Sequence, residues 1–173
     1  LDGNRSLILA LVNNINPGDI IEISYSGSGI KSVDGLSMNN FNLEVVENTI
    51  SYIHSIPGKI EAEHYFFQKG ISLEEVTDFG GGLNIGSLDK GDYADYNIKV
   101  NSSGTYNVTY RSASDPEWSS GGQVEIGFID TVSNKFSSIQ NVILPLTNGW
   151  QDWENTSKAV NLEEGNFILR VKV

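Results

Sequence analysis

The sequence predicts an all-β fold, and specifically a β-sandwich. Apolar and polar residues alternate with a period of two along much of the chain, as in strands that turn one face toward a core. Clusters of Gly, Asn, Asp or Ser interrupt the alternation roughly every 8 to 12 residues, which is typical of short antiparallel strands joined by turns. No segment has a convincing helical period.

The clearest strand covers residues 105–111, where Tyr106, Val108 and Tyr110 share one face. In the last strand, 166–173, every second residue from Phe167 to Val173 is apolar. The other strands are predicted at residues 20–25, 60–63, 93–100, 123–129 and 142–146.

The chain divides into two differently patterned parts. Residues 1–48 contain only three or four predicted strands, too few to bury both faces of a sandwich core. We therefore expect residues 1–48 to be part of a larger module or to pack on the second unit, with residues 49–57 as a linker. Residues 58–173 are predicted to form the main sandwich, and we expect it to lack its last strand because no turn signal follows the alternation that reaches Val173.

Composition narrows the class of partner. The chain has 11 Lys and Arg against 22 Asp and Glu, a net charge of -11. Because nucleic acids and anionic membranes both require a basic patch, neither is expected as a partner. The chain has no Cys, so disulfides and thiolate metal sites are excluded. No apolar run reaches the roughly 18 residues of a membrane span. We expect a secreted, monomeric bacterial protein.

Six segments in a fixed order resemble one known family. They are IEAEHY at 60–65, GGGLNIG at 80–86, DKGDYADY at 89–96, GTYNVTYR at 104–111, GWQDW at 149–153 and GNFILR at 165–170. Together they make residues 56–173 similar to the family 6 carbohydrate-binding modules, which are β-sandwich (jelly-roll) appendages of secreted glycoside hydrolases. Residues 7–48 resemble the C-terminal part of an immunoglobulin-like spacer module.

The resemblance implies a sugar site in loops at one end of the sandwich, where two aromatic rings grip a sugar. Tyr93 and Trp150 match those two positions, and Glu74 matches a position where related modules hold an acidic residue for sugar hydroxyls. A sugar ring stacks its C–H face on an aromatic plane, and each ring contributes about 2–3 kcal/mol if half of it is buried. Two such rings correspond to a Kd of roughly micromolar to millimolar.

Each aromatic residue also has a structural interpretation. Tyr93 can face the core of the sandwich, and Tyr96, three residues later on the same strand, would then face outward. Trp150 can pack under Trp153. We expect Tyr93 and Trp150 to face ligand and Trp153 to face the core. Trp118, in a turn-rich stretch, is either a second sugar platform or a tryptophan folded back on the sandwich.

Glu61 and Glu63 raise three alternatives. On a strand they would face the same side about 6.6 Å apart, within the range for the two carboxylates of an inverting glycosidase. They can also be a solvated pair. The family resemblance implies a structural calcium ion here, completed by a backbone carbonyl near Asp89 or Lys90, and carboxylate oxygens suit Ca²⁺.

We expect a non-catalytic module that binds a polysaccharide, with β-glucan favoured and xylan next, and that targets an attached glycoside hydrolase to its substrate. The alternatives are a small glycoside hydrolase that uses Glu61 and Glu63, or a structural spacer without a ligand.

Overall fold

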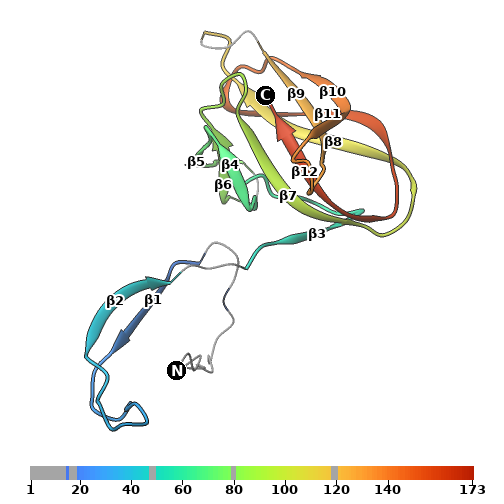
Figure 1. Ribbon diagram of the computed structural model, residues 1–173. Helices are drawn as coiled ribbons and strands as arrows, with labels where there is room; N and C mark the ends of the chain where they lie inside the picture. The colour runs from blue at the N-terminus through green and yellow to red at the C-terminus, as the bar shows by residue number, and fades with distance from the viewer. Residues whose placement is uncertain (1–14, 16–18, 47–49, 79–80, 118–120) are drawn as a thin grey trace. The chain divides into compact units, whose positions relative to one another are not determined.

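A computed structural model describes residues 15, 19–46, 50–78, 81–117 and 121–173 of the chain. The chain divides into two compact units, Leu1–Ile50 and Ser51–Val173 (Figure 1). The described residues contain no helix long and apolar enough to cross a membrane.

All regular structure in the described residues is β-strand, which confirms the predicted fold class. The strands in chain order are β1 (Ile21–Tyr25), β2 (Phe41–Val46), β3 (Ile53–Ile56), β4 (Phe67–Lys69), β5 (Ser72–Glu75), β6 (Leu83–Gly86), β7 (Tyr93–Val100), β8 (Gly104–Ser114), β9 (Gly122–Ile129), β10 (Phe136–Leu144), β11 (Gly149–Leu162) and β12 (Gly165–Lys172).

The first unit contains one antiparallel pair, β1 and β2. The rings of Tyr25 and Phe41 lie 6.2 Å apart across this pair, and the Tyr25 hydroxyl accepts a hydrogen bond from the Ile30 N–H. None of the described side chains in this unit is fully buried. The immunoglobulin-like assignment therefore stays a prediction, since two strands do not make a sandwich.

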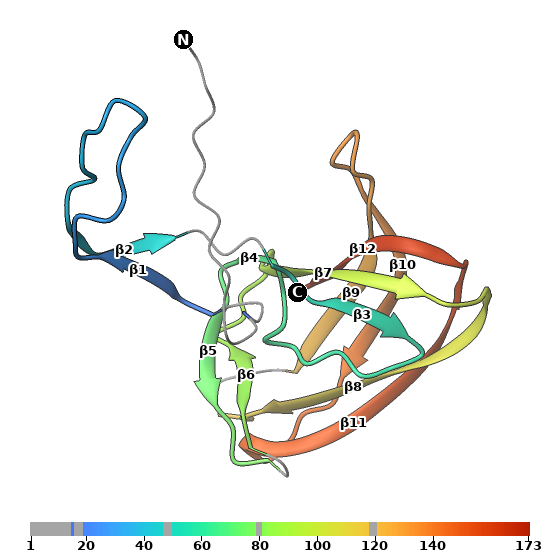
Figure 2. The same ribbon diagram turned by 90° about the horizontal axis from the view of Figure 1, so that it is seen from below.

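The second unit has two main layers. The larger sheet has the order β10-β9-β12-β7-β3, with β4 also paired to β7, and β11 pairs with β8 in a second sheet. Figure 2 shows β8 and β11 facing the larger sheet. The core between them is built from alternate residues of β7 (Ala94, Tyr96, Ile98, Val100) together with Val160 and Leu162 of β11.

Gln140 connects the two layers from inside. This buried side chain accepts a hydrogen bond from the Tyr110 hydroxyl of β8, and its amide donates to the carbonyl oxygens of Lys158 and Ala159 on β11. Burial raises the pKa of Tyr110 to about 12, so this phenol keeps its proton across the physiological range.

The fold differs from the sequence prediction in several places. Strands β2, β4, β5, β6 and β11 are not among the predicted strands. Residues 60–63 form no strand, because the His64 N–H donates to the Glu61 carbonyl three residues before it and closes a turn there. β10 ends at Leu144 because Pro145 has no N–H for the ladder. Within the expected linker 49–57, residues 53–56 form β3, which pairs in parallel with β7.

His54 of β3 lies in a buried aromatic cluster. Its Nε2–H donates to the His64 carbonyl at 3.2 Å, its ring meets Tyr96 edge-on at 6.0 Å, and Tyr52 stacks on His64 at 3.8 Å. Burial lowers the pKa of His54 below its ordinary value of 6.5, and the hydrogen bond to the His64 carbonyl opposes this without reversing it. The folded protein therefore prefers His54 neutral.

We predict that this histidine makes the fold less stable in mild acid. Below pH 6.5 the unfolded chain takes up a proton on His54 that the folded chain resists, so stability present above pH 6.5 is lost as the pH falls toward the folded pKa. One such proton changes the unfolding free energy by up to about 1.4 kcal/mol per pH unit. Urea unfolding between pH 7.5 and 5 measures this slope. An equally steep slope in His54→Gln would contradict the assignment.

Arg170 and Asp95 form a buried, two-bonded ion pair on the outer face of the larger sheet. The guanidinium Nε and Nη2 donate to the two carboxylate oxygens, each at 2.8 Å, and the two side chains are only 17% and 7% exposed. The pair joins β12 to β7, where Arg170 and Asp95 are register partners.

We predict that Arg170→Met lowers the unfolding free energy by about 3–5 kcal/mol, because it leaves the Asp95 carboxylate buried without its partner. The double variant Arg170→Met, Asp95→Asn should recover part of that loss. Lys59→Met is the control, since its pair with Glu61 is exposed (79% and 42%) and should contribute less than about 1 kcal/mol. Equal losses in Arg170→Met and Lys59→Met would contradict the account.

Candidate functional site

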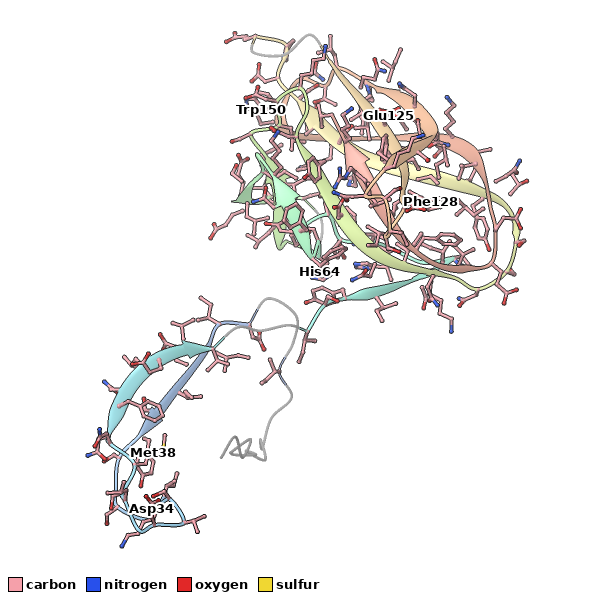
Figure 3. The ribbon with its side chains drawn as sticks, in the orientation of Figure 1. Asp34, Met38, His64, Glu125, Phe128 and Trp150 are labelled. Atoms are coloured by element: carbon pink, nitrogen blue, oxygen red, sulfur yellow. The ribbon has the colours of Figure 1, made fainter. Side chains whose placement is uncertain are left out.

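A bulge at the start of β11 presents Trp150. Gly149 pairs with Ser114 of β8, and the next paired residues are Glu154 and Ser112. Four residues of β11, 150–153, therefore lie opposite the single residue Ala113. Extra residues of this kind bend a strand and redirect its side chains, and they are common beside functional sites. Trp150 is 51% exposed, at the edge of the second unit (Figure 3).

A buried polar clamp fixes the chain before the bulge. The Ser114 N–H donates to the Thr147 hydroxyl at 2.7 Å, the Thr147 N–H donates to the Ser114 hydroxyl at 3.1 Å, and the Thr147 hydroxyl donates to the Ser114 carbonyl at 2.6 Å. After it, the Asn148 side chain donates to the Asp152 carboxylate at 2.9 Å. The approach to Trp150 is therefore held by specific hydrogen bonds where the ladder is interrupted.

The loop between β5 and β6 lies beside the same bulge. The Thr77 N–H and hydroxyl both donate to Gln151 Oε1, at 2.9 and 3.1 Å. The next residue, Asp78, forms a two-bonded ion pair with Arg111 of β8, and its carboxylate raises the pKa of Arg111. Thr77 is therefore tied to the bulge, and Asp78 to β8.

Tyr93, the other predicted sugar platform, has close neighbours of its own. It begins β7 on the face opposite to the core residue Ala94. The Arg170 guanidinium lies 3.6 Å from the centre of its ring, and the Phe67 ring is 6.1 Å away. Tyr96, by contrast, is buried in the core, and its hydroxyl donates to the Ala62 carbonyl at 2.7 Å. Among the described residues, no ring contact joins Tyr93 to Trp150.

Glu74 lies exposed on β5, opposite Asn84 of β6. Its carboxylate lies over Gly86 and would have to shift if this glycine carried a side chain. Trp153 is half-buried, and its indole N–H donates to Gln151 Oε1 at 3.4 Å. Trp118, the expected second platform, lies outside the described residues.

The structure corrects the geometry expected of Glu61 and Glu63. Because residues 60–63 form a turn, these carboxylates do not share one face of a strand, and the Glu61 carboxylate is held by Lys59 at 2.6 Å. The strand geometry from which a glycosidase pair was argued is therefore absent. Lys90 is exposed in the turn before β7, where the Asp89 carbonyl already accepts a hydrogen bond from the Asp92 N–H.

Calcium at Glu61, Glu63 and Lys90 stays a prediction of the family resemblance. Within the described ranges, no three His, Asp or Glu side chains gather as a metal-binding group. Ca²⁺ takes six to eight oxygen ligands, and the two carboxylates named here, one of them paired with a lysine, supply few of those.

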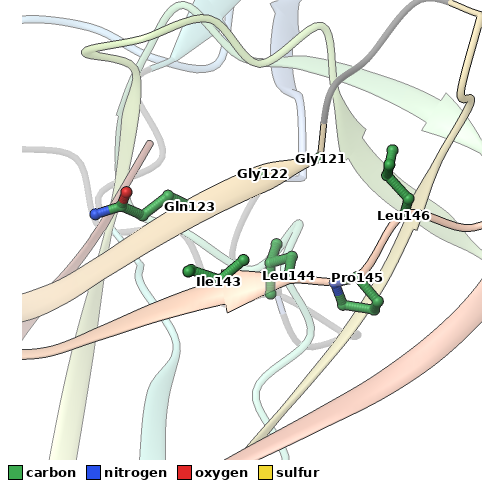
Figure 4. Close-up of a pocket in the computed structure, with 7 residues that line it drawn as sticks. All are labelled: Gly121, Gly122, Gln123, Ile143, Leu144, Pro145 and Leu146. Carbon is green, nitrogen blue, oxygen red and sulfur yellow. The ribbon is translucent and has the colours of Figure 1, made fainter.

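An open hollow of about 510 Å³ lies at the ends of β9 and β10 (Figure 4). It is lined by Gly121, Gly122, Gln123, Ile143, Leu144, Pro145 and Leu146. None of the predicted site residues lines it. The lining has no aromatic or charged side chain, so it offers apolar contact with little directional recognition.

Trp150 stays a predicted site residue, and sequence patterns did not single out the residues that brace its segment. Ser114, Thr147 and Thr77 are small polar side chains outside any motif, and Gln151 lies inside the GWQDW segment. One signal was available: the alternation of β11 breaks down in the segment GWQDW at 149–153, as it does at a bulge.

Comparison with known proteins agrees with this architecture. A family model, carbohydrate binding module (family 6), matches residues 61–173. One similar structure is a module of Cellvibrio mixtus lichenase 5A in complex with cellotriose, 34% identical, covering 65% of this chain and 83% of that one at a TM-score of 0.55. Another is a β-1,3-glucan-binding family 6 module of Bacillus halodurans, 29% identical, covering 70% and 86% at a TM-score of 0.62.

Among curated proteins, the clotting factor G alpha subunit of Tachypleus tridentatus is 34% identical over 116 residues, which are 66% of this chain and only 16% of that protein. The family model spans more than half of the chain, and the two similar structures share the fold of the second unit. The chain belongs to the family 6 carbohydrate-binding modules, which are non-catalytic binding domains.

Proposed function

We propose that the second unit binds a β-glucan, with xylan as the next candidate, and that Trp150 is its principal sugar platform. The observation that carries the proposal is a half-exposed tryptophan on a braced bulge in a chain of a carbohydrate-binding family. Similar modules support the choice of ligand: one was solved with cellotriose, one is described as binding β-1,3-glucan, and one from Clostridium cellulolyticum was solved with xylose.

The chemistry of Trp150 suits a sugar ring. The exposed indole offers an apolar plane to the C–H face of a pyranose, and the same segment of chain carries Asn148 and Asp152, polar groups of the kind that hydroxyls require. One such ring contributes about 2–3 kcal/mol. Binding by a single platform is therefore weak, and it becomes useful when the module is attached to another domain.

Tyr93 and Glu74 are further proposed sugar contacts, because they match sugar-binding positions of the family. One neighbour of the Tyr93 ring is already the Arg170 guanidinium, so a sugar at Tyr93 would pack beside this cation. Glu74 is exposed, as a carboxylate that accepts hydrogen bonds from sugar hydroxyls must be.

We further propose that the module is part of a secreted glycoside hydrolase and keeps it near its polysaccharide. Tethering raises the effective concentration of substrate around a catalytic domain without lowering any barrier. The lichenase origin of one similar module supports this arrangement.

We predict that Trp150→Ala weakens binding to the preferred glycan roughly 30- to 150-fold, the equivalent of about 2–3 kcal/mol. Isothermal titration calorimetry against laminari-, cello- and xylo-oligosaccharides measures the change and ranks the ligands. Ile143→Ala is the matched control, because Ile143 is a 78% exposed apolar side chain in the hollow. Tyr93→Ala, run in parallel, tests the second ring.

Two results would overturn the proposal. If Trp150→Ala binds as tightly as the wild type, Trp150 is not the platform. If the wild-type chain binds none of these glycans, nor any on a broad glycan array, the chain is a spacer without a ligand.

A structural calcium ion at Glu61, Glu63 and the Lys90 carbonyl stays a prediction of the family resemblance. If it binds there, millimolar CaCl₂ raises the melting temperature and EDTA lowers it, and Glu63→Gln abolishes both shifts. Differential scanning calorimetry makes the measurement. An unchanged melting temperature of the wild type in EDTA and in CaCl₂ would remove calcium from this site.

A further inference from the structure

The bulge that carries Trp150 lacks the usual source of strand rigidity. Residues 150–153 of β11 have no ladder partner on β8, because the pairing passes directly from Gly149 to Glu154. Backbone pairing therefore cannot hold the indole of Trp150 in one orientation. Side-chain contacts must do so.

Gln151 is the residue where those contacts converge. Its Oε1 accepts hydrogen bonds from the Thr77 N–H at 2.9 Å, from the Thr77 hydroxyl at 3.1 Å and from the Trp153 indole N–H at 3.4 Å. Thr77 is 74 residues away in the chain. One oxygen atom thus ties the far end of the bulge and the β5–β6 loop to the residue next to Trp150.

We propose that Gln151 is a positioning residue, which locks the β5–β6 loop against the bulge and so preorganises Trp150 for sugar binding. This inference rests on the proposed function of Trp150. Gln151 is itself exposed and outside the buried core, so its loss should loosen the site without unfolding the sandwich. If the site is disordered without ligand, binding has to order it, and the entropy lost in this ordering lowers the affinity.

The hydrogen-bond pattern makes the role specific. All three partners of Gln151 Oε1 are donors, so a carboxylate in its place can accept every bond while an apolar side chain accepts none. Gln151→Glu should therefore preserve the brace, and Gln151→Ala should remove it. If Gln151 only filled space, the effects of Gln151→Glu and Gln151→Ala would not differ in this way.

The Asp78–Arg111 ion pair holds the same loop from its other side. Asp78 follows Thr77, and its partner Arg111 lies on β8, with a further hydrogen bond to Asn155 of β11. Arg111 also donates to the Trp153 carbonyl at 3.5 Å. The loss of Gln151 should therefore free Thr77 and the side of the bulge next to Trp150 while Arg111 still holds Asp78 and Trp153.

The test combines a ligand-free measurement with a binding measurement. We expect the Thr77 amide of Gln151→Ala to exchange with deuterium at least tenfold faster than in the wild type, and its Kd for the preferred oligosaccharide to rise about three- to tenfold. Gln151→Glu should match the wild type in both. Glu154→Ala, an exposed change just after the bulge, is the control and should alter neither.

The outcomes separate this inference from the proposed function. If Gln151→Ala binds as the wild type does, or if Gln151→Glu fails in the same way as Gln151→Ala, Gln151 is not a positioning residue. If the wild type binds no glycan, the proposed function fails, and the Thr77 exchange rates alone decide whether the brace exists. Unchanged exchange in Gln151→Ala would then overturn the brace as well.

Discussion

The sandwich depends on the two-residue alternation of β7. Ala94, Tyr96, Ile98 and Val100 turn inward and pack against Val160 and Leu162 of the second layer, while β12, β3 and β4 all pair with the same strand. Apolar burial at these positions sets the register of the whole larger sheet, because a slip of one residue would turn every inward side chain outward. The same alternation puts Tyr93 and Asp95 on the outer face, where Arg170 meets both of them.

A functional site needs a departure from this regularity. In β11 the departure is the segment 150–153, which leaves the ladder and carries the half-exposed Trp150. The clamp of Ser114 and Thr147, and the contacts of Gln151, replace the lost ladder bonds with side-chain bonds. Rigid scaffolds commonly carry recognition residues in such irregular segments.

The fold class and half of the strands in the described residues were predictable from the sequence, whereas β2 to β6 and β11 were not. Strand β7 follows directly from its alternation, and β8, β9 and β12 agree to within a few residues, because burial of one face leaves a period that can be read locally. Residues 60–63 misled the prediction, since a single backbone bond from His64 to Glu61 closes a turn that the apolar pattern does not reveal. Trp150 is predicted from the family motif, whereas Thr77 and Gln151 come together only in three dimensions, across 74 residues of chain.

The central claim is that a sugar ring stacks on Trp150 at the braced bulge. An NMR titration of the isotope-labelled chain with a β-glucan hexasaccharide tests it most directly, since each amide and indole N–H reports its own surroundings. The account predicts that the largest shift changes occur at the Trp150 indole N–H, the Gln151 side-chain amide and the Thr77 backbone amide. Shift changes centred on the hollow at Ile143 and Leu146, with the Trp150 indole unaffected, would contradict it.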